Sequence, residues 1–393
     1  MSTEVTSTEV TSTEATSTES TGPAAVAGAT PASSRHGLVG GLRRRAKRRL
    51  AVEASSVRFS ANDYRQSLRI AFGALIGFVV SQLMGWNYGV FFTVFPMFLL
   101  GMVPVLNAHV VRQFLGNACL NVVEISLVVG LTQHLPAVMT VLAFAMFYGR
   151  FRLMAKGPWF LFGANGVLTL SIMLHFASYP TLDLFDLLTS NVVASVLAVG
   201  IAYLMHAIFP DVAPRPRPQP QPKSLSLQRH QTLMGAITAT LSFVVFQSLD
   251  LRDSLSAQMA TILILFALGY HGARASAQRR AIGTLLGCNL ALILQLILST
   301  QSDHLMLVVS SYLIGLLLFA REHVIEGAGS GIGFGGLTTL GILFGQYLGP
   351  NQDLVYDAFY RFSSMCVALM ATLVVMAVLH RLLNAWAPTR ATD

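Results

Sequence analysis

The sequence predicts an all-α membrane protein, a polytopic helical bundle of two parallel repeats with about six transmembrane helices each. Three observations lead to this fold class: a composition poor in charge, a series of long apolar segments, and a residue pattern that recurs in both halves. Hydrophobic residues make up 53% of the 393 residues and charged residues only 11%, against roughly 45–50% and about 25% in soluble domains. A lipid-facing surface needs no charged shell, because each helix satisfies its own backbone.

The first 60 residues are predicted to form a disordered, low-complexity and basic cytoplasmic tail. The tail opens with a repeated Ser-Thr-Glu-rich pentad and ends with a basic cluster at 43–49. Such a cluster could bind nucleic acid, bind lipid headgroups or set the membrane topology. The lipid and topology readings are favoured beside a hydrophobic bundle, so no nucleic-acid partner is expected. No cleavable signal peptide is predicted, because the first apolar stretch begins only near Leu68.

Twelve apolar segments follow the tail, and each is interpreted as a helix within the membrane. The fourth segment and several others are short, which leaves a count of ten or eleven open. The predicted extents are 68–86, 89–106, 110–131, 136–149, 158–176, 187–209, 232–249, 255–271, 281–299, 304–320, 331–348 and 360–383.

The distribution of basic residues supports this threading of the chain. With the N-terminus in the cytoplasm, all 26 Lys and Arg residues except Arg252 and Arg361 fall on the cytoplasmic side, as the positive-inside rule requires. The outer loops carry acids instead, such as Asp183 and Asp250. We therefore expect a multi-pass protein of the bacterial inner (plasma) membrane with both termini in the cytoplasm.

A Pro-rich segment after residue 210 divides the twelve segments into two sets of six. Gln66 and Gln82 recur as Gln231 and Gln247 at the same spacing, and further polar matches follow in the same order. Because each half has an even number of spans, the repeat is predicted to be parallel rather than inverted. A chance likeness between apolar helices is the alternative. The predicted domains are 61–210 and 230–386 for the two repeats, 211–229 for the linker and 387–393 for a cytoplasmic tail.

Small and helix-breaking residues interrupt the fifth predicted helix of each half at corresponding places. Paired interruptions often mark the substrate site of a transporter, because unwound backbone can present amides and carbonyls to a ligand. Close packing of helices through small residues is an equal alternative. The residues assigned to the substrate pathway are Gly157, Pro158, Asn165 and Gly166 in the first half and Gly331, Gly333, Gly335 and Gly336 in the second.

Glu124 is the one carboxylate clearly within a predicted span. A charge at this depth usually faces a cavity, holds a proton or has a basic partner, so Glu124 is the candidate for proton coupling. A protonated structural Glu or an error in the predicted register is the alternative. Arg112, Arg279 and Arg280 begin the third helix of each half at the cytoplasmic side, where they could attract an anionic substrate or act only as topology signals.

No cofactor, metal site or enzymatic activity is predicted. Cys119, Cys288 and Cys366 lie in apolar segments without the Cys or His spacing of a zinc site. The Gly-rich stretch at 329–336 has neither the preceding strand nor the following Lys of a nucleotide-binding loop. Membrane enzymes normally show clustered His, Asp or Glu residues at a membrane face, and the sequence has no such cluster.

The segment 280–287, Arg-Ala-Ile-Gly-Thr-Leu-Leu-Gly, resembles the R-x-x-G-T-x-x-G signature of the fusaric-acid-resistance-like (FUSC, aromatic acid exporter) superfamily. In context the resemblance covers roughly residues 60–385. It implies a proton-driven exporter of aromatic carboxylic acids or related toxic compounds that works beside a periplasmic membrane-fusion adaptor. The chain would be a short form, because it lacks the large soluble domain that many relatives carry between their halves. The motif positions are Arg280, Gly283, Thr284 and Gly287, with Arg112, Gly116 and Asn117 in the first half, where Asn117 replaces the Thr.

The main hypothesis is therefore an efflux permease for small organic acids. Its expected partners are membrane lipids, a small organic anion and a periplasmic adaptor, and a homo-oligomer is left open. The alternative is a non-transporting membrane scaffold that anchors an adaptor or envelope complex. Substrate flux in proteoliposomes would distinguish the two hypotheses.

Overall fold

The computed structural model describes residues 59–391 except 133–134, 178–182, 216–222, 252–253, 299–303, 328, 330 and 347–353. The basic cluster at 43–49 and nearly all of the predicted tail lie outside the described residues. The described chain consists of helices and connecting segments without β-strands, so the all-α prediction is confirmed.

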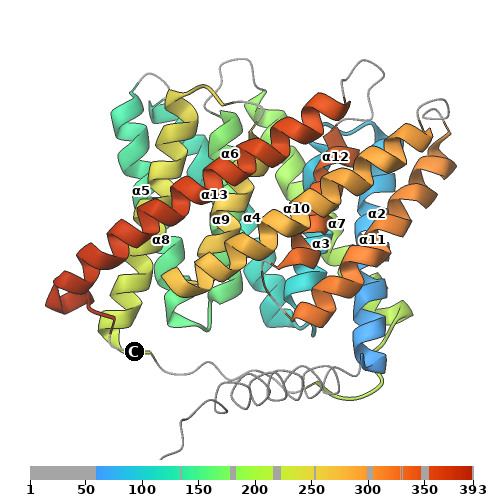
Figure 1. Cartoon of the computed structure of the whole chain (residues 1–393), viewed down its shortest axis with the longest axis horizontal. Coiled ribbons are helices and arrows are strands. Elements are labelled where there is room, and N and C mark those ends of the chain that lie inside the picture. Colours follow the sequence, from blue (N-terminus) through green and yellow to red (C-terminus); the bar gives the residue numbers. More distant parts are fainter. Residues whose placement is uncertain are drawn as a thin grey trace, which may run out of the picture. The chain divides into compact units, whose positions relative to one another are not determined.

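Twelve α-helices occupy the described residues, and each covers one of the predicted apolar segments (Figure 1). The first six are α2 (Ala61–Met84), α3 (Gly89–Met102), α4 (Ala108–Thr132), α5 (Pro136–Lys156), α6 (Phe160–Ala177) and α7 (Leu184–Ile208). The second six are α8 (Leu225–Ser248), α9 (Leu255–Leu265), α10 (Tyr270–Leu298), α11 (Leu305–Glu326), α12 (Ile332–Gln346) and α13 (Leu354–Ala385). A short 3-10 helix, η1 (Ala387–Thr389), follows α13.

Local capping residues determine where several of these helices begin and end. Ser60 and Asp63 form a reciprocal capping box at the start of α2. The Asp183 carboxylate accepts hydrogen bonds from two backbone amides at the start of α7, and the Ser224 hydroxyl accepts one from the Leu227 amide at the start of α8. Gly85 ends α2 in the left-handed conformation that glycine adopts without strain.

Eight helices of the described chain are long and apolar enough to cross a membrane: α2, α4, α5, α6, α7, α10, α11 and α13. This set is compatible with a multi-pass membrane protein. Helices α3, α9 and α12 have only 14, 11 and 15 residues. At about 1.5 Å per residue they are shorter than the roughly 30 Å hydrocarbon core of a bilayer. Helix α8 is also not among the eight candidate membrane-spanning helices. The described chain thus has fewer helices that could each cross a bilayer than the ten to twelve predicted spans.

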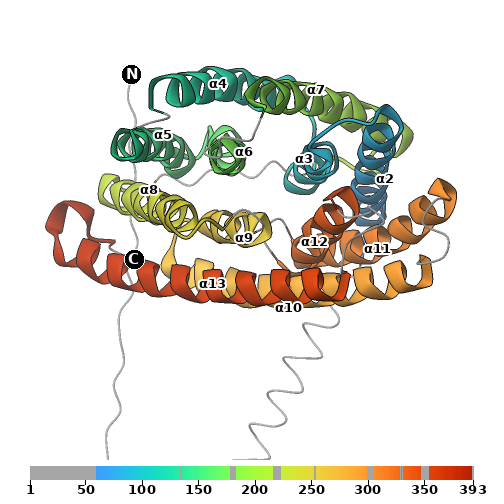
Figure 2. The same ribbon diagram turned by 90° about the horizontal axis from the view of Figure 1, so that it is seen from above.

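Seen from above, the helices lie in four rows (Figure 2). Helices α4 and α7 form one outer row, and α10 and α13 form the opposite one. Between them lie the inner rows α5–α6–α3–α2 and α8–α9–α12–α11, whose members face each other in the pairs α5·α8, α6·α9, α3·α12 and α2·α11. The short helices α3 and α9 are almost entirely buried at the centre of this arrangement.

The contacts between helices are reciprocal in the two halves. The fourth helix of the first half packs on the first helix of the second half, and the fourth helix of the second half packs on the first helix of the first. The second and fifth helices are paired across the halves in the same way. A parallel repeat would produce this pattern, and the repeat itself stays a prediction.

Two predicted boundaries differ from the structure. Helix α8 begins at Leu225, so the segment between the halves ends before residue 229. The segment after α13 packs back onto the bundle rather than leaving it, because Thr389 is buried and its carbonyl accepts a hydrogen bond from His230 Nδ1 at 2.9 Å. The predicted C-terminal tail is therefore folded at least as far as Thr389.

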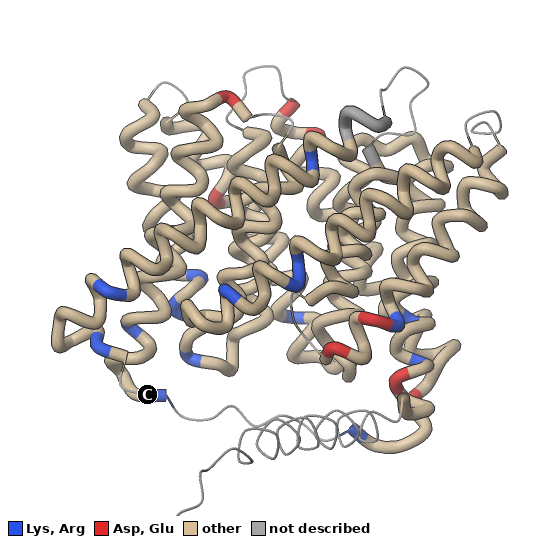
Figure 3. The backbone as a smooth tube through the Cα atoms, in the orientation of Figure 1, with Lys and Arg blue, Asp and Glu red and all other residues tan. Residues whose placement is uncertain are grey.

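The Lys and Arg residues of the described chain gather toward one end of the bundle (Figure 3). We call this the basic end. Helices α5 and α7 run toward it; Arg152 and Lys156 lie near the end of α5, and Arg215 follows α7. The caps and loops at the opposite end contain Asp183 and Asp250. Figure 3 shows acidic residues at both ends, so it is the gathering of Lys and Arg that agrees with the charge pattern used above. The cytoplasmic orientation of the basic end stays a prediction.

Candidate functional site

An ion pair between a buried arginine and a partly buried glutamate lies where α4, α5 and α6 meet. Arg150 of α5 donates from Nη2 to Glu124 Oε2 of α4 at 2.7 Å and to Asn121 Oδ1 at 3.0 Å. Its guanidinium carbon lies 4.9 Å from the centre of the Phe162 ring of α6. Arg150 is only 3% exposed, and Asn117 of α4 is fully buried beside it. We call Arg150, Glu124, Asn121 and Asn117 the Arg150 site.

The structure gives Glu124 the basic partner that an intramembrane carboxylate needs. Sequence reasoning missed this partner because it ended the fourth segment at residue 149 and assigned Arg150 to a loop. Helix α5 instead continues to Lys156, which places Arg150 inside the bundle. The usable signal was Glu124 itself: a carboxylate in a span requires a cation nearby, and Arg150 is carried by the next helix along the chain.

Several polar atoms of the Arg150 site are buried without a hydrogen-bond partner. They are Arg150 Nε, Asn121 Nδ2, and both the Nδ2 and Oδ1 atoms of Asn117. Buried polar groups in folded proteins are nearly always paired, and each unpaired one costs about 1–3 kcal/mol. A cluster of such atoms around one cation is the arrangement expected where water or a polar ligand completes the site.

An open cleft of about 620 Å³ leads to the Arg150 site. The cleft exists because α4 and α5 touch each other only sparsely, while both pack against α6. Its charged lining residues are Arg150, Arg152 and Lys156 against the single acid Glu124, so the cleft is cationic. The remaining lining residues are Leu120, Ala145, Met146, Gly149, Leu153 and Phe162. Such a cleft suits a small molecule with an anionic group and an apolar body.

Gly166 leaves the space that Arg150 and Asn117 occupy. A Cβ atom at Gly166 would lie 2.6 Å from Arg150 Nε and 2.7 Å from Asn117 Oδ1. Asn165 is also buried on α6, where its carbonyl accepts a hydrogen bond from the Thr169 hydroxyl at 2.7 Å. The predicted pathway residues Asn165 and Gly166 therefore lie on the α6 helix that packs against the Arg150 site.

The predicted interruption of the fifth helices is wrong. Helix α6 is continuous, and Gly157 and Pro158 lie in the turn before it, where Gly157 has a φ of 93°. Helix α12 is also continuous over its described residues, and Gly331 precedes it. Close packing explains the glycines inside α12, because a Cβ at Gly333 would lie 2.0 Å from the His323 backbone nitrogen. A Cβ at Gly336 would lie 2.2 Å from the Phe319 ring, and one at Gly335 would lie 3.2 Å from the Arg280 carbonyl oxygen.

The residues of the family signature form the contact between α10 and α12. Arg280 is buried, and its Nη2 donates to Thr338 Oγ1 at 3.0 Å. Thr284 Oγ1 accepts a hydrogen bond from Thr339 Oγ1 at 3.2 Å. A Cβ at Gly283 would meet the Ile332 carbonyl, and one at Gly287 would meet Gly336. In this chain these residues serve the packing of α10 on α12, where threonine hydroxyls lie beside the buried Arg280.

The three arginines expected at the start of the third helices differ in burial and in helix position. Arg112 and Arg279 are exposed, whereas Arg280 points into the bundle. Helix α10 begins at Tyr270, so Arg279 and Arg280 lie well inside it. Gly116 is exposed on α4, with Phe162 as the nearest side chain to a Cβ placed there.

Among the residues that the structure describes, no three His, Cys, Asp or Glu side chains lie close enough to hold a metal ion. Cys119, Cys288 and Cys366 are free thiols.

Comparison with known family models finds a match over part of the chain. Residues 66–205 match the model of a family described as a protein of unknown function (DUF2955). The matched region runs from α2 into α7 and contains all of the Arg150 site. No curated protein and no solved structure matches the chain.

Proposed function

We propose that this protein is an inner-membrane efflux permease for small organic acids, with aromatic carboxylic acids or related toxic compounds as its cargo. The Arg150 site carries the proposal. The Arg150 guanidinium is buried, forms an ion pair with the Glu124 carboxylate and lies at the end of a cationic cleft. Arginine binds carboxylates through paired hydrogen bonds, so a cargo carboxylate is a fitting ligand for it.

The lining of the cleft supports an aromatic or aliphatic body for the cargo. Phe162 packs over the guanidinium, and Leu120, Met146 and Leu153 supply apolar walls. Lys156 and Arg152 add positive charge along the cleft, which raises the local concentration of anions. An uncharged molecule of the same size would gain none of these electrostatic contacts.

Glu124 is the proposed coupling residue. The Glu124 carboxylate and a cargo carboxylate would compete for the same guanidinium, so a proton on Glu124 removes the competitor. The outward direction, the proton drive and a periplasmic adaptor are carried over from the resemblance of residues 280–287 to the exporter superfamily. The gathering of basic residues at one end supports a cytoplasmic location for both termini.

The test is transport of 4-hydroxybenzoate from loaded proteoliposomes at alkaline pH, where the acid is ionised and leaks little. We expect the wild type to release the acid in response to an imposed pH gradient. Glu124→Gln should abolish this response, because the amide cannot take up a proton but can still accept a hydrogen bond from Arg150. Arg150→Lys should lose flux at every pH, because one ammonium cannot replace the planar guanidinium.

Glu322→Gln is the matched control, since Glu322 lies on α11 away from the cleft. Its flux should equal that of the wild type. A wild-type protein that folds but carries no aromatic acid, and that copurifies with an envelope protein, would overturn the proposal and favour a membrane scaffold.

A further inference from the structure

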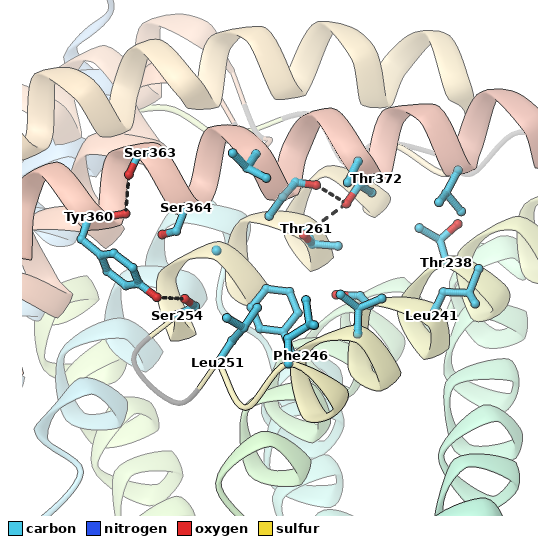
Figure 4. A pocket seen from close by; sticks show the side chains of 18 residues that line it. Thr238, Leu241, Phe246, Leu251, Ser254, Thr261, Tyr360, Ser363, Ser364 and Thr372 are labelled. Atoms are coloured by element: carbon cyan, nitrogen blue, oxygen red, sulfur yellow. Dashed lines mark hydrogen bonds between the residues drawn. The ribbon is translucent and has the colours of Figure 1, made fainter.

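A second pocket lies between α8, α9 and α13, on helices that contribute nothing to the Arg150 site (Figure 4). Its volume is about 460 Å³. This falls within the range of about 300–1,000 Å³ that is usual for small-molecule sites. The pocket is therefore large enough for a ligand of one or two rings.

Hydroxyl groups are the main polar groups that line this pocket. Figure 4 shows Tyr360 Oη and Ser254 Oγ paired at 2.9 Å, and Thr372 Oγ1 donating to Thr261 Oγ1 at 3.3 Å. Ser242 Oγ is buried without a hydrogen-bond partner. None of the 18 described residues that line the pocket is charged. Such a site repels ions, because it offers no opposite charge to offset their desolvation.

The rim of the pocket is formed by apolar side chains on the outside of the bundle. Leu249 is 64% exposed, and Val367 is 69% exposed. Leu241 and Val245 of α8 are also exposed beside the opening. Exposed aliphatic side chains on apolar helices face lipid in a membrane protein, so the pocket would open sideways into the bilayer.

The second helix of the first half carries larger side chains than α9 at the same two helix positions. Phe91 and Phe95 are the third and seventh residues of α3, and both are buried. The third and seventh residues of α9 are instead Ala257 and Thr261, which line the pocket. Helices α2 and α3 also touch directly, since a Cβ at Gly77 would lie 2.0 Å from the backbone of α3. The small side chains of Ala257 and Thr261 therefore contribute to the open space between α8, α9 and α13.

We propose that this pocket binds an uncharged, membrane-dissolved aromatic or alicyclic molecule that carries a hydroxyl group. The apolar walls bind the ring, and the hydroxyl pairs and Ser242 exchange hydrogen bonds with the ligand. A lipid acyl chain would leave Ser242 unpaired, so the hydroxylated ligand is the better match. The proposal is independent of the transport proposed above, because the two sites share no residue.

The test measures binding of 1-naphthol to the full-length protein in lipid nanodiscs, with empty nanodiscs to subtract partition into the lipid. Ala368→Phe and Ala371→Phe would each fill the pocket, and Ala371 is already exposed at its mouth, so that variant should fold normally. Val374→Phe is the matched control: it lies on the same helix, is 61% exposed and does not line the pocket.

We expect saturable 1-naphthol binding that weakens at least tenfold in both pocket variants and is unchanged in Val374→Phe and in Arg150→Lys. Naphthalene, which lacks the hydroxyl, should bind more weakly, and the anion 1-naphthoate should not compete. Equal binding in the wild type and in Ala371→Phe would overturn the proposal. Competition by 1-naphthoate, or a tightly held phospholipid that 1-naphthol cannot displace, would overturn it as well.

Discussion

Replacing Gly166 by Ala tests whether the side chains of the Arg150 site are held rigidly in place. The new methyl group would lie 2.6 Å from Arg150 Nε and 2.7 Å from Asn117 Oδ1, far inside normal contact distance. Neither neighbour can move aside freely, because Arg150 is held by Glu124 and Asn121 and the Asn117 side chain is buried. Overpacking of this kind in a well-packed interior costs about 1–3 kcal/mol.

Gly200 provides the matched control on α7. A Cβ there would meet no atom within 4 Å, so Gly200→Ala brings only the better helix propensity of Ala, worth about 0.5–1 kcal/mol. The two variants add the same atoms to helical glycines, so the gain in helix propensity cancels and their stabilities should differ by the overpacking cost of roughly 1–3 kcal/mol.

The free energy of unfolding can be compared by titrating SDS into mixed detergent micelles and following far-ultraviolet circular dichroism. Gly166→Ala should unfold at less SDS than the wild type, and Gly200→Ala at the same or more. If both variants unfolded at the same SDS concentration, the guanidinium and the Asn117 amide would have room to move. The reasoning that the Arg150 site is rigid would then be refuted.

Three further predictions concern other contacts. Arg150→Met leaves the partly buried Glu124 carboxylate, whose side chain is 18% exposed, without its cation and should lower the free energy of unfolding by roughly 3–5 kcal/mol. Glu124→Gln keeps a hydrogen-bond acceptor for Arg150 and should cost less; equal losses in the SDS titration would contradict this. Burial, with smaller contributions from Asp186 and Asp183, raises the pKa of Tyr88 to about 12 from its usual 10. The folded state therefore keeps this proton after the unfolded state has lost it, and the stability that Tyr88 contributes should fall as the pH rises from about 10 to 12. The difference in tyrosinate absorbance between the wild type and Tyr88→Phe should have its midpoint near pH 12, and a midpoint near 10 would show the phenol to be freely solvated. Asp183→Ala removes the cap of α7 and should cost about 1 kcal/mol in the same SDS titration, as should Ser224→Ala at α8; unchanged stability in both variants would count against the observed caps.

Helix positions were predictable from sequence because the signals are local. Apolar runs, and caps such as Ser60 and Asp183, act within a few residues of the helix ends that they determine. The same holds for Glu124, whose charge within an apolar segment marks it as unusual without any knowledge of the fold. All twelve helices of the described chain accordingly cover predicted segments.

The role of the glycines was open in the sequence because two different structures need small residues. An unwound helix and a closely packed one both favour glycine, and only the contacts of Gly166 and Gly333 show that packing accounts for these positions. The end of the fourth segment was misjudged for a related reason. A charged residue such as Arg150 is normally expected outside an apolar segment, so the segment was ended before it. Arg150 can be buried only because the Glu124 carboxylate of another helix pairs with it.

The sequence by itself determined the all-α class, the order of the helices, the concentration of basic residues outside the apolar segments and the unusual position of the Glu124 carboxylate within one of these segments. Only the tertiary structure decided that Arg150 is the partner of Glu124, that α6 and α12 are continuous, and that α8, α9 and α13 enclose a pocket. The physical reason is one of range. Hydrophobicity and capping act between neighbours in the chain, whereas ion pairing, close packing and cavities depend on which side chains from distant segments meet.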